Sequence, residues 1–253
     1  MNDATVREDL PFTVIAKRCL TPSIVELTLR PVGDPIDYQA GQYVLLGDAG
    51  YNQPPRSYSA ANAPRPDATI DLLVTLVPGG EVSPWVHHQL HPGDDVLVSG
   101  AYGTFLDEHE DDRPRLYVAG GSGLAPVRAL AEAALRRPKP PAMTLLFSAR
   151  TANDLIDDKL FLRWQHDQPN FHYLRTLTRA TGPPPVGHIP NVLPELLPPL
   201  GTHRVYIAGG SGFVAACERA VRRHGAVAGR VFTEEFFADP RPWGDDETSQ
   251  GGH

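Results

Sequence analysis

The sequence predicts a chain of two successive units, an antiparallel β-barrel followed by an α/β unit built on a parallel sheet. Three observations favour this fold class. The N-terminal part holds short β-rich segments separated by turns rich in Gly and Pro, which is typical of a small barrel. The second part alternates apolar strands with helices, as a parallel sheet covered on both faces does. An acidic stretch at residues 107–112 lies between the two patterns and is expected to be a linker.

The expected barrel strands are short, and one of them shows its burial clearly. Val25, Leu27 and Leu29 alternate with Glu26 and Thr28, which is the two-residue period of a half-buried strand. We expect strands at residues 12–16, 24–29, 42–46, 56–60, 70–77 and 95–99, with one short helix at residues 82–90.

The second part is expected to hold five strands and three helices. The strands are expected at residues 116–119, 143–147, 173–178, 205–208 and 231–232, and the helices at residues 124–137, 154–166 and 213–224. A Pro-rich stretch precedes residue 205, and its residues 187–190 are expected to form a turn. We therefore expect a barrel domain at residues 1–110, an α/β domain at 111–238 and a loose tail at 239–253.

Composition excludes several classes of protein. The 253 residues are 41% hydrophobic and carry a formal net charge of −7, so nothing favours a nucleic-acid partner. No apolar run approaches the roughly 20 residues of a membrane span, and the N-terminus lacks an apolar signal core, so a cytoplasmic location is expected. Two cysteines are too few for an iron–sulfur cluster, which takes about four. His87, His88 and His91 have no neighbouring ligand to complete a site, so no metal is expected.

A glycine-rich turn after the first apolar strand of the second part is the sharpest local motif. Gly121, Ser122, Gly123 and Pro126 lie between an expected strand and an expected helix, where glycines let a phosphate approach the backbone and the helix N-terminus. The run from residue 115 to 123 recurs almost unchanged at residues 204–212. Two such turns at one sheet edge predict a dinucleotide site, although a tight turn without a ligand remains the alternative.

The next strand bears on which nicotinamide coenzyme such a site would take. It ends with Ser148 and Arg150, and Arg179 follows one strand later. These side chains suit a ribose hydroxyl or a 2′-phosphate, and His188 could approach the same phosphate. The alternative for each arginine is a solvated surface charge. Together they favour NADPH without excluding NADH.

The barrel half carries a segment that resembles the flavin signature of the ferredoxin–NADP reductase superfamily, Arg56-Ser57-Tyr58-Ser59. Further segments resemble other parts of that family and follow in the same order between residues 11 and 238. They are residues 38–44 before the signature, 78–83 at the flavin pyrophosphate turn, 92–94 and 100–105 at the barrel's last strand and exit, 120–126 at the NAD(P) turn, and 233–236 at the C-terminal Glu-x-Phe element.

The resemblance implies FAD on the barrel, NADPH or NADH on the α/β domain, and hydride transfer from nicotinamide C4 to flavin N5. It implies that Arg56 pairs with a flavin phosphate, that Tyr58 contacts the flavin, and that Val82 and Ser83 border the pyrophosphate. Catalytic roles by the same carry-over fall on Ser59, Glu234 and Phe236, with Glu234 as a proton relay. The remaining residues expected to bind a cofactor are Ser57, Gly120, Gly121, Ser122, Gly123, Pro126, Ser148, Arg150, Arg179, Gly209 and Gly210.

Three positions depart from the family pattern. Ala208 stands where the family usually has a cysteine beside the nicotinamide, and Cys217 lies too far along the chain to replace it. Thr75 stands where a basic residue is common, so one phosphate contact is expected to be missing. The tail beyond the family's usual end contains Trp243, which is expected to have no role.

The electron acceptor stays open at the level of sequence. The leading hypothesis is a separate redox partner, either a ferredoxin or an oxygenase component. The second is a free flavin or another small molecule as acceptor. The third is a flavin-binding redox sensor or regulatory subunit, which only the altered turn at Ala208 supports.

Overall fold

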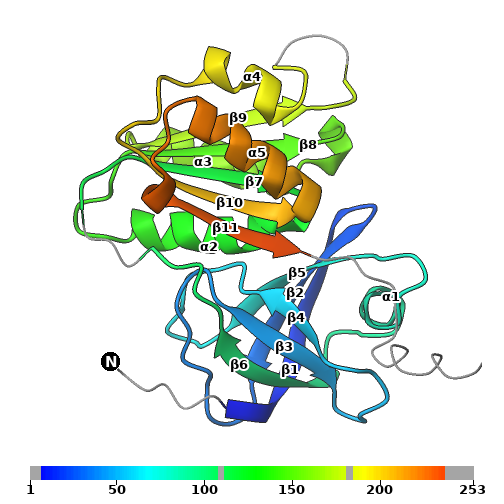
Figure 1. Cartoon of the computed structure of the whole chain (residues 1–253). Helices are drawn as coiled ribbons and strands as arrows, with labels where there is room; N and C mark the ends of the chain where they lie inside the picture. The colour runs from blue at the N-terminus through cyan, green and yellow to red at the C-terminus, as the bar shows by residue number, and fades with distance from the viewer. Residues whose placement is uncertain (1–6, 108–110, 181–184, 237–253) are drawn as a thin grey trace, which may run out of the picture.

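The computed structural model describes residues 7–107, 111–180 and 185–236. Figure 1 shows a six-stranded sheet curled below a five-stranded sheet that has helices on both faces. This arrangement confirms the predicted fold class, an antiparallel barrel followed by a parallel α/β unit. Residues 239–253, including Trp243, lie outside the described residues.

The barrel is antiparallel throughout, and its strands follow the order β4-β3-β6-β1-β2-β5. A bridge between Ala60 and Leu72 joins the strand that continues from β4 to the strand at the other end of this order, which closes the sheet. Val25, Leu27 and Leu29 are buried inside, as their alternation predicted. The elements are β1 (Arg7–Thr21), β2 (Ile24–Pro31), β3 (Tyr43–Asp48), β4 (Arg56–Ser59), β5 (Ile70–Thr75), α1 (Val82–His88) and β6 (Asp95–Tyr102).

The second sheet is parallel, with strand order β11-β10-β7-β8-β9. Its strands are β7 (Arg115–Gly120), β8 (Met143–Ala149), β9 (Phe171–Leu177), β10 (Arg204–Gly210) and β11 (Val231–Phe236). The chain moves outward from β7 to β9 and then returns to the other side of β7, so β7 and β10 flank the point where the strand order reverses. Ligands of such sheets bind outside the carboxyl ends of strands at this point.

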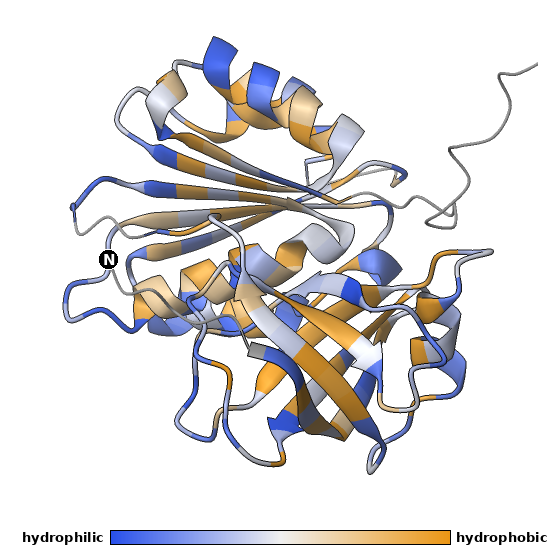
Figure 2. Ribbon diagram, turned by 60° about the horizontal axis from the view of Figure 1, so that its bottom comes forward, coloured by the Kyte–Doolittle hydropathy of each residue, from blue (hydrophilic) through white to orange (hydrophobic). Residues whose placement is uncertain are grey.

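Helices cover both faces of the parallel sheet. α2 (Leu124–Leu135) and α3 (Asp158–Asp167) pack on one face, and α4 (Ile189–Leu196) and α5 (Ser211–Arg223) pack on the other. Short 3₁₀ turns lie at η1 (Gly121–Gly123), η2 (Ala152–Asp154) and η3 (Ala228–Arg230). Apolar residues are frequent along the strands between these layers (Figure 2). Among the described residues, no helix has the length and apolar character needed to cross a bilayer.

The turn expected at residues 187–190 is wrong in its second half, because α4 begins at Ile189. His188 is the N-cap residue, and Pro190 occupies the first turn, where proline fits a helix because its missing N–H needs no partner. Ile189 and Leu193 are buried one turn apart on this helix. Pro190 and Pro194, which follow these two residues directly, made the helical spacing of Ile189 and Leu193 hard to recognise in the sequence.

The described acidic residues of the expected linker make ion pairs. The Asp107 carboxylate, 3% exposed, lies 3.1 Å from the buried guanidinium of Arg115 and accepts a hydrogen bond from the hydroxyl of Tyr206 at 2.8 Å. Asp111 pairs with Arg115 at 2.9 Å and with Arg204, which holds the pKa of the Asp111 carboxyl well below its usual value. Asp107 and Asp111 therefore neutralise arginines at the amino ends of β7 and β10.

The barrel and the α/β unit pack as one body. An apolar cluster extends from Leu73 and Phe105 of the barrel to the residues of α2. Arg128 of α2 is buried at the same interface and lies 2.8 Å from Glu26 of the barrel. It also pairs with Asp157, at the start of α3. Removing one partner of a buried ion pair is costly, so these contacts hold the two units in a fixed relation.

Candidate active site

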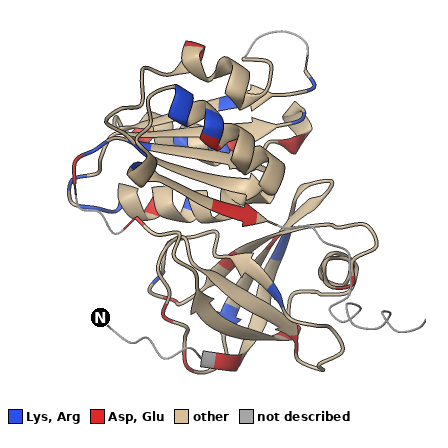
Figure 3. Cartoon of the chain, viewed as in Figure 1, with Lys and Arg blue, Asp and Glu red and all other residues tan. Residues whose placement is uncertain are grey.

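A cleft of about 1620 Å³ lies between the barrel and the carboxyl edge of the parallel sheet. Typical pockets for one small ligand have about 300–1,000 Å³, so this cleft has room for more than one ligand. Its walls come from the barrel strands β4 and β5, from the segment at residues 79–83, and from the turns that follow β7, β8 and β10. The end of β11 enters the cleft beside the barrel, and Figure 3 shows the acidic residues there.

The four residues of β4 all line the cleft, from Arg56 to Ser59. The guanidinium of Arg56 has one hydrogen bond among the described residues, from Nη1 to the Pro55 carbonyl at 3.3 Å, so most of its donors are available to a ligand. Burial raises the pKa of Tyr58 to about 12, which keeps its phenol protonated and able to donate. This wall offers one cation and several hydroxyl groups.

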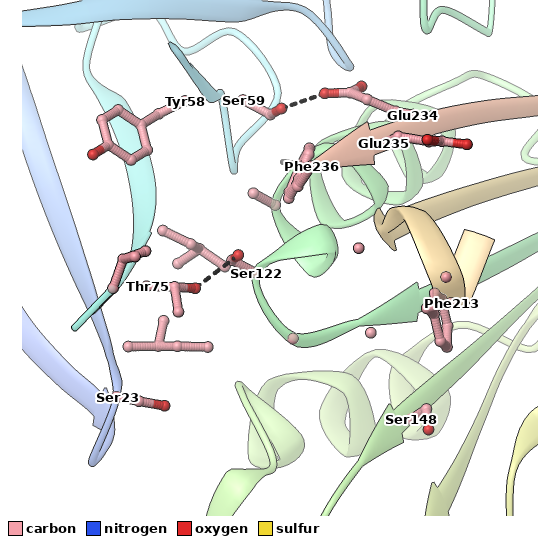
Figure 4. Close-up of a pocket in the computed structure, with 18 of the residues that line it drawn as sticks. Ser23, Tyr58, Ser59, Thr75, Ser122, Ser148, Phe213, Glu234, Glu235 and Phe236 are labelled. Carbon is pink, nitrogen blue, oxygen red and sulfur yellow. Dashed lines mark hydrogen bonds between the residues drawn. The ribbon is translucent and has the colours of Figure 1, made fainter. Parts of the chain in front are cut away.

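Ser59 and Glu234 meet across the junction of the two units (Figure 4). The Ser59 hydroxyl donates to Glu234 Oε1 at 2.6 Å, and Glu234 Oε2 is buried without a hydrogen-bond partner among the described residues. Burial raises the pKa of Glu234 to about 7, against the lowering effect of the Ser59 hydrogen bond. A carboxyl with this pKa exchanges a proton readily near neutral pH.

The segment at residues 79–83 forms the wall next to β5. Gly79 has φ +78°, a backbone conformation that favours glycine, and a Cβ there would meet nothing within 4 Å. Ser83 Oγ accepts a hydrogen bond from the Val77 N–H at 2.9 Å. The hydroxyl proton of Ser83 is not used in this bond and remains available to a ligand. Val82 and Ser83 are both buried and line the cleft.

The two glycine turns lie side by side after β7 and β10, and they differ in which glycines face the cleft. At Gly121 and Gly210 a Cβ would meet nothing within 4 Å, so these positions leave the backbone accessible. The helices α2 and α5 begin at these turns, and helix N-termini favour anions such as phosphates. The arrangement suits the phosphates of a dinucleotide.

The other glycines of these turns serve packing. A Cβ on Gly123 would lie 2.3 Å from the Ala208 carbonyl oxygen, so only glycine lets the two turns approach so closely. A Cβ on Gly120 or Gly209 would meet the ring of Phe213 at 3.1 or 2.8 Å. Gly123, Gly209 and the buried Pro126 do not line the cleft, although Gly120 and Ser122 do.

At the far end of the cleft, Ser148 and Arg150 line the wall, while Arg179 is exposed and does not. His188 and Asn191, at the start of α4, line the same region. Sequence reasoning missed Asn191 because it missed the helix. It also missed Asp154, which lines the wall and whose carboxylate accepts hydrogen bonds from Thr151, and Phe213, which no motif singled out. Tyr43 also lines the cleft; it belongs to the family-like segment at residues 38–44, but the resemblance implied no role for it.

Of the residues named above as departures from the family pattern, Cys217 and Thr75 line the cleft and Ala208 does not. Ala208 is fully buried and does not line the cleft. Cys217 lies at the cleft wall, but burial raises the pKa of its thiol to about 12, so the thiol stays protonated and unreactive. The hydroxyl of Thr75 donates to the hydroxyl of Ser122 at 2.8 Å.

The residues of the cleft fit FAD and a nicotinamide dinucleotide. Arg56 supplies a cation for a phosphate, and Gly121 and Gly210 leave open backbone where a side chain would otherwise stand. The unpartnered oxygen of Glu234 lies between the two units. A ligand there would complete its hydrogen bonding.

Two known protein families match the two units separately. Residues 11–106 match the family described as the oxidoreductase FAD-binding domain, and residues 117–219 match the oxidoreductase NAD-binding domain.

Curated relatives include the reductase component of a dioxygenase. The chain is 30% identical over 243 residues to reductase component 1 of terephthalate 1,2-dioxygenase from Comamonas sp, covering 94% of this chain and 71% of the relative. It is 33% identical over 170 residues to the phenol hydroxylase P5 protein of Acinetobacter pittii, covering 67% of this chain and 48% of that protein. The chain thus spans from about half to about seven tenths of the length of these relatives.

Solved structures of reductases superpose on most of this chain. The Amycolatopsis cytochrome P450 reductase superposes with a TM-score of 0.85 at 29% identity, over 92% of this chain and 71% of that chain. The ferredoxin reductase in carbazole 1,9a-dioxygenase superposes with a TM-score of 0.82 at 25% identity, over 94% of this chain and 71% of that chain.

Proposed function

This chain belongs to the ferredoxin–NADP reductase superfamily as an FAD-dependent NAD(P)H oxidoreductase, and we propose that it passes electrons from its flavin to a separate redox protein. The single observation that carries the flavin and nicotinamide chemistry of this proposal is the continuous cleft between the β4 wall and the two glycine turns. One ligand on each wall would place two ring systems in contact, and positioning of this kind lowers the barrier to hydride transfer.

We assign the flavin to the barrel wall. Arg56 would bind a phosphate of FAD, Ser57 and Tyr58 would contact its sugar chain or ring, and Val82 and Ser83 would border its pyrophosphate. This assignment rests on the position of these residues along one wall and on the donors that Arg56 and Ser83 leave available. When bound, FAD accepts a hydride and releases electrons singly or in pairs.

We assign NADPH or NADH to the opposite wall. Gly120, Gly121, Ser122 and Gly210 would hold the nicotinamide and phosphate part. Ser148, Arg150 and His188 would contact the adenosine part, and Arg150 supports NADPH because a guanidinium suits a 2′-phosphate. Gly123, Gly209 and Pro126 would act indirectly, through the packing that sets the shape of the turns.

Ser59, Glu234 and Phe236 border the junction where the two ring systems would meet. The Ser59 hydroxyl is held by Glu234 at 2.6 Å, so it has a fixed orientation toward the cleft. The Glu234 carboxyl, with its pKa raised to about 7, can take up or release a proton there. Phe236 would cover the ring and exclude water.

The acceptor that we propose is a ferredoxin or an oxygenase component. The 253 residues contain two cysteines, one of them buried, so they do not supply the ligands of a cysteine-bound cluster. One relative named above is the reductase component of a dioxygenase. We also propose a cytoplasmic location, because reduced nicotinamide coenzymes are the electron source.

The test has two steps. Purified protein should show the absorbance of bound flavin, which anaerobic NADPH or NADH should bleach rapidly. Reduced protein should then transfer electrons faster to a ferredoxin or oxygenase component than to free flavin, with a rate that falls as salt rises. Fast turnover with free flavin and no gain from any protein would favour the flavin reductase alternative. Flavin that is not bleached would leave only the sensor alternative.

A further inference from the structure

The hydroxyls of Thr75 and Ser122 form a second polar contact across the cleft, apart from Ser59 and Glu234 (Figure 4). Thr75 is the last residue of β5 in the barrel, and Ser122 is the middle residue of η1 in the α/β unit. The two hydroxyl oxygens are 2.8 Å apart, and both side chains are half-buried and line the cleft. The barrel therefore contacts the first glycine turn directly.

The turn that carries Ser122 is fixed from behind as well. A Cβ on Gly123 would lie 2.3 Å from the Ala208 carbonyl oxygen, so the backbone of η1 already abuts β10. The end of β5 is equally constrained, because the Leu76 N–H donates to the Ser23 carbonyl at 2.8 Å. Ser122 is thus held between β10 and Thr75, and its side chain has little freedom.

The hydrogen bond between Thr75 and Ser122 leaves one hydroxyl proton of the pair able to donate to a ligand. Each hydroxyl has one proton and can accept hydrogen bonds. The bond between Thr75 and Ser122 uses one of the two protons, and the other remains for a group in the cleft. A neutral, oriented donor of this kind suits an amide or hydroxyl oxygen, such as those of the nicotinamide carboxamide and its ribose.

We infer that Thr75 is a positioning residue for hydride transfer, which orients the Ser122 hydroxyl toward the nicotinamide end of the coenzyme and sets the distance between that turn and the barrel. The inference rests on the proposed function of the cleft. Thr75 adds no charge, so its effect falls on the geometry of the nicotinamide rather than on the retention of FAD.

The experiment uses FAD-loaded protein and anaerobic stopped-flow mixing with NADPH and with NADH. Thr75→Val keeps the shape of the side chain and removes the hydroxyl. We expect the limiting rate of flavin reduction to fall about 3- to 10-fold, as for loss of one neutral hydrogen bond, with FAD occupancy and the coenzyme dissociation constant within about 2-fold. The long-wavelength absorbance of nicotinamide stacked on flavin should weaken in parallel, and Thr75→Ser should restore both.

Two further variants separate positioning from a general structural effect. Thr75→Val combined with Ser122→Ala should be no slower than Ser122→Ala alone, because Thr75 acts through Ser122. The matched control is Thr13→Val, since the Thr13 hydroxyl also makes one hydrogen bond in the barrel, to Asp95 at 2.9 Å, outside the cleft. That variant should reduce its flavin at the wild-type rate.

The inference is overturned by a Thr75→Val rate and stacking absorbance equal to wild type, by additive losses in the double variant, or by loss of FAD from Thr75→Val. The last result would place the hydroxyl on the flavin. Failure of the proposed function looks different, because the wild-type flavin itself would then not be reduced.

Discussion

The carboxyl of Glu234 is expected to make the stability of the protein depend on pH, and Glu234→Gln should remove that dependence. Glutamine keeps the shape and an oxygen that can accept the hydrogen bond of Ser59, but it cannot ionise. Burial raises the pKa of Glu234 from 4.5 to about 7 in the folded protein. The variant therefore isolates the free energy of ionising one buried carboxyl.

The sign of the effect follows from the order of the two pKa values. Below about pH 4.5 the carboxyl is protonated in both states and contributes no difference. As pH rises toward 7, the unfolded chain loses the proton first, and stability falls by about 1.4 kcal/mol per pH unit. Above the folded-state pKa the loss levels off at about 3 kcal/mol.

We expect the stability of Glu234→Gln relative to wild type to increase by about 2 kcal/mol between about pH 5.5 and about pH 8.5. The assay is urea unfolding of both proteins, without added coenzyme, at several pH values. Glu235→Gln is the matched control, because the Glu235 side chain is the next one on β11 and is exposed. It should show no such pH-dependent gain.

A difference between Glu234→Gln and wild type that stays constant across this pH range, within about 0.5 kcal/mol, would refute the reasoning. It would mean that the carboxyl is hydrated in the folded protein, and the proposed exchange of a proton at this oxygen near neutral pH would lose its basis.

Three further predictions concern the two walls of the cleft. Arg56→Ala should weaken FAD binding by about 1–3 kcal/mol, as for a charge-assisted hydrogen bond; a titration of the apoprotein that gives wild-type affinity would contradict the phosphate role. Arg150→Ala should raise KM for NADPH more than for NADH, whereas Arg179→Ala should change neither, since its side chain lies outside the cleft; steady-state kinetics check both. Gly123→Ala should destabilise the fold by about 1–3 kcal/mol, the size expected for overpacking, because its Cβ would lie 2.3 Å from a carbonyl oxygen. Gly210→Ala has open space and should unfold at nearly the wild-type temperature.

Much of the fold was predictable because local patterns agreed with the final packing. The alternation around Leu27 and the apolar run at residues 116–119 each reflect which faces of a strand become buried. The helix α4 was missed because Pro190 and Pro194 argue for a turn, while the burial of Ile189 and Leu193 depends on α5, which follows much later in the chain.

Parts of the cleft lining were predictable where the residues follow one another in the sequence. The segment from Arg56 to Ser59 and the turn around Gly121 do line one cleft. The reason for each glycine was not predictable, since Gly123 is explained by a carbonyl on β10 and Gly209 by the ring of Phe213. Contacts of this kind join residues far apart in sequence.

The sequence by itself determined the order of the two units, most of their strands and helices, and the cofactor classes, because these follow from periodicity and from motifs of neighbouring residues. Only the tertiary structure decided that Glu234 loses water and bonds to Ser59, that Thr75 bonds to Ser122, and that Asp107 neutralises the buried Arg115. Burial and the distance between side chains set these properties, and both exist only once distant segments have packed together.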